Sequence, residues 1–146
     1  MLTLGCAVQQ PFRSYNILVL EDNPEDAQLI REAFSDCGKA CSLAFAKDTQ
    51  QARNLLCSDN FDLLISDMGH RNDEGAQFIR GLRSDTRLKT LPVIVISGSQ
   101  DSRLAYEAGA NAFVVKAADT NGFSSKLKAL MHFWIEVVEL PRVPAN

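Results

Sequence analysis

Short apolar runs recur along this chain, and their apolar residues do not alternate with polar ones. The runs 63–65 and 93–96 consist entirely of Leu, Ile and Val. A strand covered on one face alternates apolar with polar residues, whereas a strand covered on both faces reads as a continuous apolar run. The strands of parallel sheets have helices on both sides and show this pattern, so the sequence favours strands that are covered on both faces.

Segments with strand and helix patterns alternate along the chain. Strands are expected at about residues 16–20, 42–46, 61–66, 92–96 and 112–115. Helices are expected at about residues 24–37, 49–57, 75–83, 101–108 and 121–139. This alternation predicts a single α/β domain in which helices cover both faces of a parallel sheet.

The first helix carries start and stop signals. Asn23 is a good N-cap, and Pro24 follows at the first helical position, where its missing N–H costs nothing. Glu25 and Asp26 complement the positive end of the helix dipole. Gly38 can end the helix.

Composition excludes several classes of protein. The 146 residues are 46% hydrophobic and 23% charged, which is typical of a globular domain. The net charge is −3 and no basic block is present, so we expect no nucleic-acid partner. No apolar run approaches the length of a membrane span, and residues 1–14 lack the pattern of a signal peptide. We expect a cytoplasmic protein without a membrane partner.

Four cysteines are present: Cys6, Cys37, Cys41 and Cys57. No histidine lies near enough to Cys37 and Cys41 to suggest a zinc site. We expect all four to be reduced thiols that fill small apolar sites.

Polar groups stand after four of the expected strands. Glu21 and Asp22 follow the first strand, Asp67 the third, Ser97 the fourth and Lys116 the fifth. Each group alone is an ordinary loop, cap, turn or strand-end residue. In open α/β sheets, however, ligands bind beyond the carboxyl ends of the strands, so the joint placement favours a functional site.

The chemistry of these groups suits metal-assisted phosphoryl transfer. Clustered carboxylates need a cation or a retained proton, and hard oxygen ligands favour Mg²⁺. Asp22 and Asp67 are the expected direct ligands together with the Gly69 carbonyl, and Glu21 is expected to act through a water. Lys116 and the Ser97 hydroxyl can contact phosphoryl oxygens. Asp67 would then be the nucleophile that forms an acyl phosphate.

Four motifs resemble the receiver domain of two-component response regulators. They are Ile17–Asn23, Phe61–Asp67, Pro92–Gly98 and Gly109–Lys116, and the resemblance covers roughly residues 15–131. It implies a flavodoxin-like (βα)5 fold, a three-layer sandwich whose sheet has the strand order 2-1-3-4-5. We expect residues 15–140 to form this domain, between an N-terminal extension (1–14) and a tail (141–146).

The resemblance implies that a histidine kinase phosphorylates Asp67 in the presence of Mg²⁺. The protein would be a phosphoacceptor that catalyses only its own phosphotransfer and dephosphorylation. Asp22 carries over as a metal ligand, Glu21 as the accompanying acid, and Ser97 and Lys116 as the hydroxyl and lysine. Phe113 matches the family's aromatic switch and could equally be a plain core residue.

Two positions depart from the family pattern. Lys116 is usually followed by a proline in a cis bond, but Ala117 follows it here, and a non-proline cis bond costs about 2.5–4 kcal/mol. Arg71 stands where proline is common, and nearby His70 is expected to be a solvated loop residue.

The last expected helix is more apolar than one packed face requires. Its apolar residues cover about 200° of the helical wheel, where a surface helix needs about 100°. They include Phe133, Trp134 and Val137, and the excess suggests a protein–protein contact. The chain ends shortly afterwards, so we expect output through this surface and not through a DNA-binding domain.

The tail 132–141 and the opening 21–26 resemble single-domain regulators partnered with phytochrome-type histidine kinases. That resemblance implies a homodimer formed through the fourth helix, fifth strand and fifth helix. Two alternatives stay open. A pseudo-receiver would bind partners without phosphorylation, consistent with Arg71 and Ala117. An aspartyl phosphohydrolase of the haloacid dehalogenase type would need a second aspartate where Gly69 stands, which argues against it.

Overall fold

The computed structural model describes residues 14–37, 40–68, 72–116 and 118–141. Within them, five parallel strands form one sheet in the order β3-β2-β4-β5-β6. The strands are β2 (Tyr15–Leu20), β3 (Cys41–Ala46), β4 (Leu63–Asp67), β5 (Val93–Ser97) and β6 (Ala112–Val115). The helices are α2 (Pro24–Ser35), α3 (Thr49–Ser58), α4 (Asn72–Ser84), α5 (Arg103–Ala108), α6 (Thr120–Met131) and η1 (His132–Val137).

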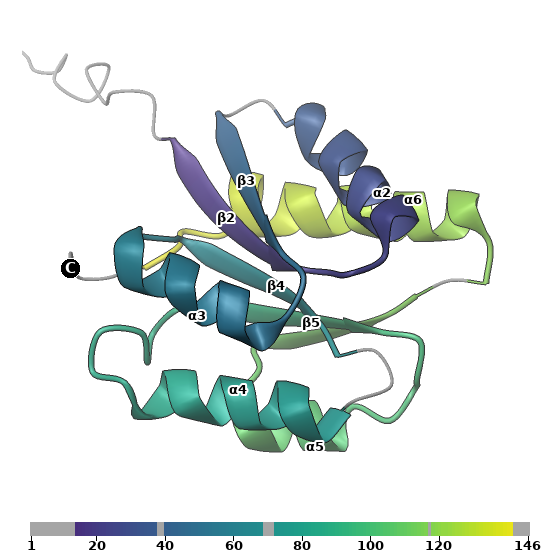
Figure 1. Cartoon of the computed structure of the whole chain (residues 1–146). Helices are drawn as coiled ribbons and strands as arrows, with labels where there is room; N and C mark the ends of the chain where they lie inside the picture. The colour runs from purple at the N-terminus through teal and green to yellow at the C-terminus, as the bar shows by residue number, and fades with distance from the viewer. Residues whose placement is uncertain (1–13, 38–39, 69–71, 117, 142–146) are drawn as a thin grey trace, which may run out of the picture.

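The elements form three layers (Figure 1). Helices α2 and α6 cover one face of the sheet, and α3, α4 and α5 cover the other. Counted in chain order, the strands of the sheet follow the order 2-1-3-4-5. The predicted flavodoxin-like α/β fold is therefore confirmed.

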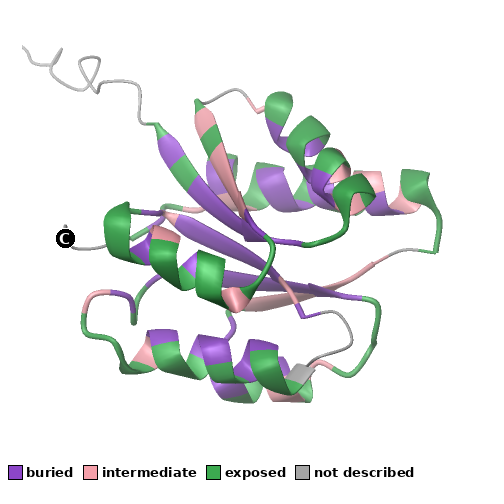
Figure 2. Ribbon diagram, in the orientation of Figure 1, coloured by how far each residue is buried: buried purple, intermediate pink, exposed green. Residues whose placement is uncertain are grey.

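The central strands are buried on both faces, as their continuous apolar runs predicted (Figure 2). Successive residues point to opposite sides of the sheet. Ile94 and Ile96 pack in the core under α2 and α6, whereas Val93 and Val95 pack in the core on the α3–α5 side. This two-sided core fixes the sheet, so that the carboxyl ends of its strands meet at one edge.

Strand β4 begins two residues later than expected. Phe61 is buried in the core, but it precedes the strand. The backbone N–H of Asp62 donates to the Asn16 carbonyl at 2.7 Å, and the Asp62 carboxylate accepts from the Asn16 N–H at 2.9 Å. These two bonds hold the start of β2 against the segment before β4.

The start of α2 agrees with the sequence prediction, and its end does not. The Asn23 side chain accepts from the N–H groups of Glu25 and Asp26, and Pro24 opens the helix. The helix ends at Ser35 with Asp36 as its C-cap, and Gly38 lies outside the described residues.

The cysteines are less buried than expected. Cys37 and Cys41 are half-buried with their sulfur atoms 3.5 Å apart, and Cys57 is exposed on α3. The prediction of a buried thiol is therefore wrong for Cys57. Cys6 lies outside the described residues.

The last helix does not continue as an α-helix to residue 139. After Met131 the backbone widens into the π-helical η1, and the Val138 N–H donates to the Phe133 carbonyl at 2.8 Å. This i→i+5 turn changes which side chains face the core. Ile135 is fully buried, whereas Phe133 and Val137 are exposed. In the described part of the chain, no helix is long and apolar enough to cross a membrane.

Candidate phosphoacceptor site

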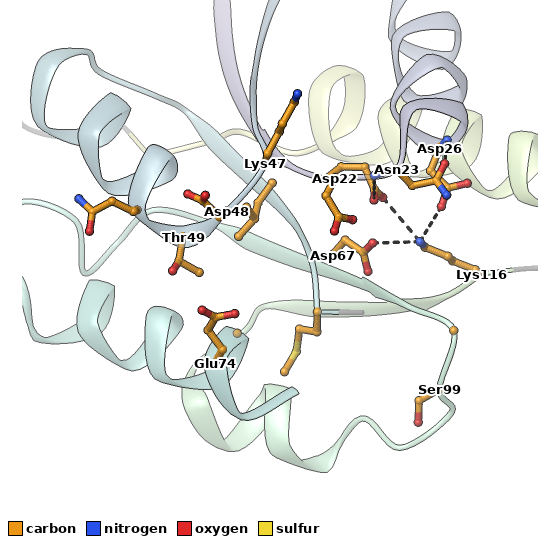
Figure 3. Close-up of a pocket in the computed structure, with 16 residues that line it drawn as sticks. Asp22, Asn23, Asp26, Lys47, Asp48, Thr49, Asp67, Glu74, Ser99 and Lys116 are labelled. Atoms are coloured by element: carbon orange, nitrogen blue, oxygen red, sulfur yellow. Dashed lines mark hydrogen bonds and ion pairs between the residues drawn. The ribbon is translucent and has the colours of Figure 1, made fainter. Parts of the chain in front are cut away.

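The predicted polar groups lie at the carboxyl edge of the sheet, where Figure 3 shows Asp22, Asp67 and Lys116 around one pocket. Asp67 is the last residue of β4, and Ser97 is the last residue of β5. Lys116 follows β6, and its backbone N–H donates to the Ser97 carbonyl at 2.8 Å. Glu21 follows β2, so residues from four strands share this edge, as the strand-end rule predicts.

Lys116 is the central cation of the edge. Its Nζ lies 2.7 Å from Asp26, 3.1 Å from Asp67 and 3.6 Å from Glu21. Burial alone would lower the pKa of Lys116. The hydrogen bond to Asp26 and the negative charges of Asp67 and Glu21 outweigh burial and raise that pKa above its usual value. The acidic neighbours therefore favour the ammonium form of Lys116.

Glu21 is the most buried acid of the site. Burial, followed by the nearby carboxylate of Asp67, raises the pKa of Glu21 from 4.5 to about 8. Its Oε2 accepts a hydrogen bond from the Asn23 N–H at 3.1 Å. Its Oε1 is buried and accepts no hydrogen bond from any residue that the structure describes. Burial and the neighbouring carboxylate therefore favour the protonated form of this carboxyl group.

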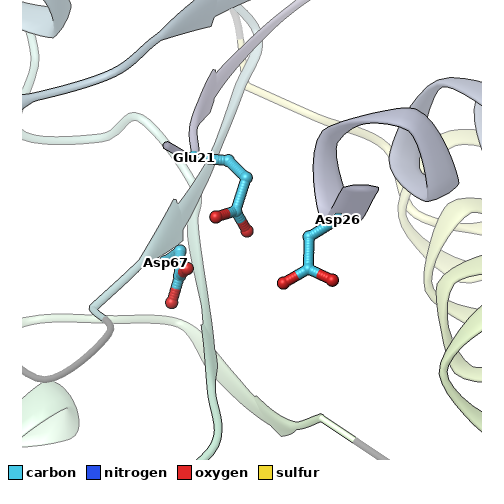
Figure 4. A group of neighbouring side chains, drawn as sticks. All are labelled: Glu21, Asp26 and Asp67. Carbon is cyan, nitrogen blue, oxygen red and sulfur yellow. The ribbon is translucent and has the colours of Figure 1, made fainter. Parts of the chain in front are cut away.

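Three acids come close enough together to hold a cation. Glu21, Asp26 and Asp67 offer carboxylate oxygens that all lie within 4.8 Å of one another (Figure 4). In this structure the cation that these three acids share is the Lys116 ammonium, 2.7 Å from Asp26, 3.1 Å from Asp67 and 3.6 Å from Glu21. Carboxylate oxygens are also the ligands that a divalent ion such as Mg²⁺ prefers, so the chemistry of Asp67 and Glu21 fits such an ion. Asp22 is exposed and lines the same pocket without belonging to this close group.

Asp26 is the site residue that the sequence analysis missed. It was interpreted only as a complement to the helix dipole, and its carboxylate in fact contacts Lys116. One sequence pattern could have identified Asp26 as a site residue. A carboxylate in the first turn of a helix that directly follows a strand lies near the carboxyl edge of the sheet.

The Ser97 hydroxyl is buried, and Ser97 is 1% exposed. Its Oγ accepts a hydrogen bond from the Ser99 N–H at 3.1 Å. Phe113 is half-buried in β6 and packs against the core on the α3–α5 side. Gly69, His70, Arg71 and Ala117 lie outside the described residues, so the carbonyl ligand and the peptide bond after Lys116 stay predictions.

The site opens into a broad pocket. Beside the acids and Lys116, the β3–α3 segment contributes Lys47 and Asp48, and α4 contributes Glu74. Figure 3 shows these side chains around the space in front of Asp67. This pocket leaves the carboxylate side of Asp67 accessible from outside the molecule.

The apolar residues predicted as an interface lie at the far end of the chain. Phe133 is 51% exposed and Val137 is 60% exposed. Trp134 is half-buried against the core, and its ring meets the Phe133 ring edge to face with centroids 5.7 Å apart.

Comparisons with known proteins agree with this geometry. The model of the response regulator receiver domain family matches residues 17–128. The chain belongs to this family. It is the receiver domain of a response regulator in two-component signalling, a signalling module and not a typical enzyme.

The chain matches some relatives over nearly their whole length. The chain is 31% identical over 117 residues to the chemotaxis protein CheY of Pseudomonas aeruginosa, covering 78% of this chain and 94% of CheY. It is 24% identical over 135 residues to the response regulator Rcp1 of Synechocystis, covering 86% of this chain and 92% of Rcp1.

A solved structure shares the fold closely. The phosphorylated cyanobacterial phytochrome response regulator RcpA superimposes with a TM-score of 0.81 at 24% identity, covering 88% of this chain and 99% of RcpA. A response regulator Rcp1 has also been solved in its Mn²⁺-bound form, and it superimposes with a TM-score of 0.80 at 23% identity. This match covers 87% of this chain and 99% of the Rcp1 chain.

Proposed function

We propose that this protein is a single-domain response regulator that accepts a phosphoryl group on Asp67 from a sensor histidine kinase in the cytoplasm. One observation carries the proposal. Asp67 ends a buried strand at the open edge of the sheet, with the ammonium of Lys116 3.1 Å from its Oδ2. A nucleophilic carboxylate beside a fixed cation is the arrangement that phosphoryl transfer to an aspartate requires.

The transfer exchanges one bond for another. A carboxylate oxygen of Asp67 bonds to phosphorus while the bond from phosphorus to the donor nitrogen breaks, and the electron pair leaves with the donor imidazole. Lys116 stays protonated and offsets charge on the phosphoryl oxygens. The Ser97 oxygen accepts from the Ser99 N–H, and its hydroxyl proton can donate to one of these phosphoryl oxygens.

Mg²⁺ is the proposed cofactor, and when bound it would neutralise phosphoryl oxygens and the acidic cluster. Asp67, Asp22 and Glu21 are its proposed protein partners, together with the Gly69 carbonyl. The placement of Glu21, Asp22 and Asp67 around one pocket supports a cation at this place.

The proposed kinase is of the phytochrome type. Support comes from RcpA, a regulator described as a phytochrome response regulator, to which this chain is similar over nearly all of RcpA's length. The proposed assembly is a homodimer through the last helix, supported by the exposure of Phe133 and Val137.

The deciding experiment uses a small phosphodonor. We expect wild-type protein incubated with phosphoramidate and Mg²⁺ to gain one labile acyl phosphate, detected by intact-mass spectrometry and lost on treatment with hydroxylamine. Asp67→Asn should gain none. If wild type gains no adduct, the protein is a pseudo-receiver, and if phosphate is released in large excess over protein, it is a hydrolase.

A further inference from the structure

Asp26, and not Asp67, makes the shortest contact with Lys116. The distance from Nζ to an oxygen of Asp26 is 2.7 Å, against 3.1 Å to Asp67 and 3.6 Å to Glu21. Asp26 lies on α2, outside the strand ends that form the rest of the site (Figure 4). A charge-assisted hydrogen bond of this length is among the stronger polar contacts in proteins.

The backbone that carries Asp26 is held firmly at the edge of the sheet. The Asn23 side chain accepts from the Asp26 N–H at 3.0 Å, and the Asn23 N–H donates to the carboxyl group of Glu21 at 3.1 Å. These bonds connect the first turn of α2 to the end of β2. The backbone position of Asp26 is therefore fixed, and its carboxylate accepts a hydrogen bond from Lys116 at that position.

The pair is partly shielded from water. The side chains of Lys116 and Asp26 are 21% and 22% exposed, and the Lys116 ammonium lies 5.9 Å from the centre of the Phe123 ring. Lysine has a long flexible stem, and a carboxylate in fixed position restricts where its ammonium can lie. Asp26 thus restricts the positions that the Lys116 ammonium can adopt.

We propose that Asp26 is a positioning residue for phosphoryl transfer, which holds the Lys116 ammonium against the oxygen of Asp67 where the new bond forms. An ammonium has three N–H groups. One donates to Asp26 and another to Asp67, and the third stays available for a phosphoryl oxygen. This inference rests on the proposed function.

The contact with Asp26 also persists through the reaction. When the Asp67 oxygen bonds to phosphorus and the donor bond breaks, Asp67 ceases to be a carboxylate, and its attraction for Lys116 moves to the phosphoryl oxygens. Asp26 takes no part in this exchange of bonds. Lys116 therefore has one constant anchor while its other partner changes.

The test compares Asp26→Asn with Glu25→Gln in the full chain. Both changes remove one acidic charge from the first turn of α2, and Glu25 has no contact with Lys116 among the described residues. With saturating phosphoramidate and Mg²⁺, we expect the rate of acyl-phosphate formation to fall about tenfold in Asp26→Asn, as the loss of one charged hydrogen bond predicts. We expect Glu25→Gln to stay within about twofold of wild type.

A second measurement, the ¹⁵N NMR signal of Lys116 Nζ, reports whether the ammonium is fixed in hydrogen bonds. Ammonium protons fixed in hydrogen bonds exchange slowly, so we expect a ¹⁵Nζ signal of Lys116 in wild type and in Glu25→Gln, and its loss in Asp26→Asn. A merely structural role of Asp26 in capping α2 would leave this signal in place.

Three outcomes would overturn the inference. One is a rate for Asp26→Asn equal to that of Glu25→Gln, and another is an unchanged Lys116 signal. The third is a Mg²⁺ affinity that falls more than about tenfold by calorimetry in Asp26→Asn, which would make Asp26 a metal ligand instead. If wild type itself forms no acyl phosphate, the proposed function fails, and the ¹⁵Nζ comparison still decides whether Asp26 fixes Lys116.

Discussion

The hydroxyl oxygen of Ser97 accepts a hydrogen bond of 3.1 Å from the backbone N–H of Ser99. This bond orients the Ser97 side chain along its own turn. The hydroxyl proton takes no part in this bond, so Ser97 can still donate to the phosphoryl group that we propose on Asp67. The turn after β5 thus holds the oxygen of this donor in place.

Replacing Ser97 by alanine should affect both the turn and the reaction. The Ser99 N–H loses its acceptor, so we expect the free energy of unfolding to fall by about 1 kcal/mol in urea denaturation. Acyl-phosphate formation should slow by about tenfold, because one donor to the phosphoryl group is missing. Ser102→Ala is the control, since the Ser102 side chain makes no capping hydrogen bond at the start of α5. Equal rates in the two variants would contradict the role of Ser97.

The buried acid Glu21 should make stability depend on pH in metal-chelating buffer. Its pKa is raised from 4.5 to about 8 in the folded protein, so between these values the folded state holds a proton that the unfolded state has lost. The Glu21 contribution to stability is therefore fully present below about pH 4.5 and is lost as pH rises through about 8.

Glu21→Gln should remove this dependence. We expect the free energy of unfolding of wild type, measured relative to Glu21→Gln, to fall steadily from pH 5 to pH 8.5. The exposed Glu25→Gln variant should instead run parallel to wild type. Parallel curves for Glu21→Gln and wild type would show that the carboxyl group of Glu21 titrates as an ordinary acid.

Arg83 joins α4 to the segments around β5 and β6. Its guanidinium donates to the carbonyls of Gly109 at 2.9 Å, Leu91 at 2.8 Å and Lys89 at 3.0 Å, and to Oδ1 of Asn111 at 2.9 Å. We expect Arg83→Met to lower the free energy of unfolding by about 2–3 kcal/mol, because these acceptors lose a charged donor.

The control for Arg83 lies on the same helix. Arg80 is exposed, and we expect Arg80→Met to change the free energy of unfolding by less than about 0.5 kcal/mol. Both variants should still form the acyl phosphate, because Arg83 and Arg80 lie outside the pocket around Asp67. A loss of phosphorylation in folded Arg83→Met would contradict this separation of stability from chemistry.

The sequence predicted the fold and the strand-end groups because both follow from local patterns. Apolar runs such as 93–96 indicate strands buried on two faces, and parallel strands bring their carboxyl ends together. Asp67, Ser97 and Lys116 were therefore placed correctly at one edge without knowledge of any contact.

The missed features depend on how elements pack. The contact of Asp26 with Lys116 requires the first turn of α2 to lie beside the end of β6. No local sequence pattern predicts that these two segments are neighbours. The π-helical turn is a second example. The Val138 N–H donates to the Phe133 carbonyl five residues earlier, and Ile135 in this turn is fully buried. An ideal helical wheel assigns Phe133, Trp134 and Val137 to one continuous face, whereas the structure buries Trp134 partly and exposes the other two.

The last prediction concerns these two exposed side chains. Phe133 and Val137 place apolar surface in solvent on η1, where Ile135 is the buried residue, and such surface is stabilised by a partner that covers it. If that partner is a second copy of the chain, a charge at Phe133 should separate the copies. Phe133 is 51% exposed, so the substitution should leave the core intact.

We expect wild type to sediment as a dimer and Phe133→Glu as a monomer with an unchanged circular dichroism spectrum. Asn54→Glu adds the same charge on exposed α3, on the other face of the sheet, and should remain dimeric. A dimeric Phe133→Glu would place the interface elsewhere, and a monomeric wild type would exclude self-association. Because the half-buried Trp134 packs against the core, Phe133 tests the interface with less risk to folding than Trp134→Glu does.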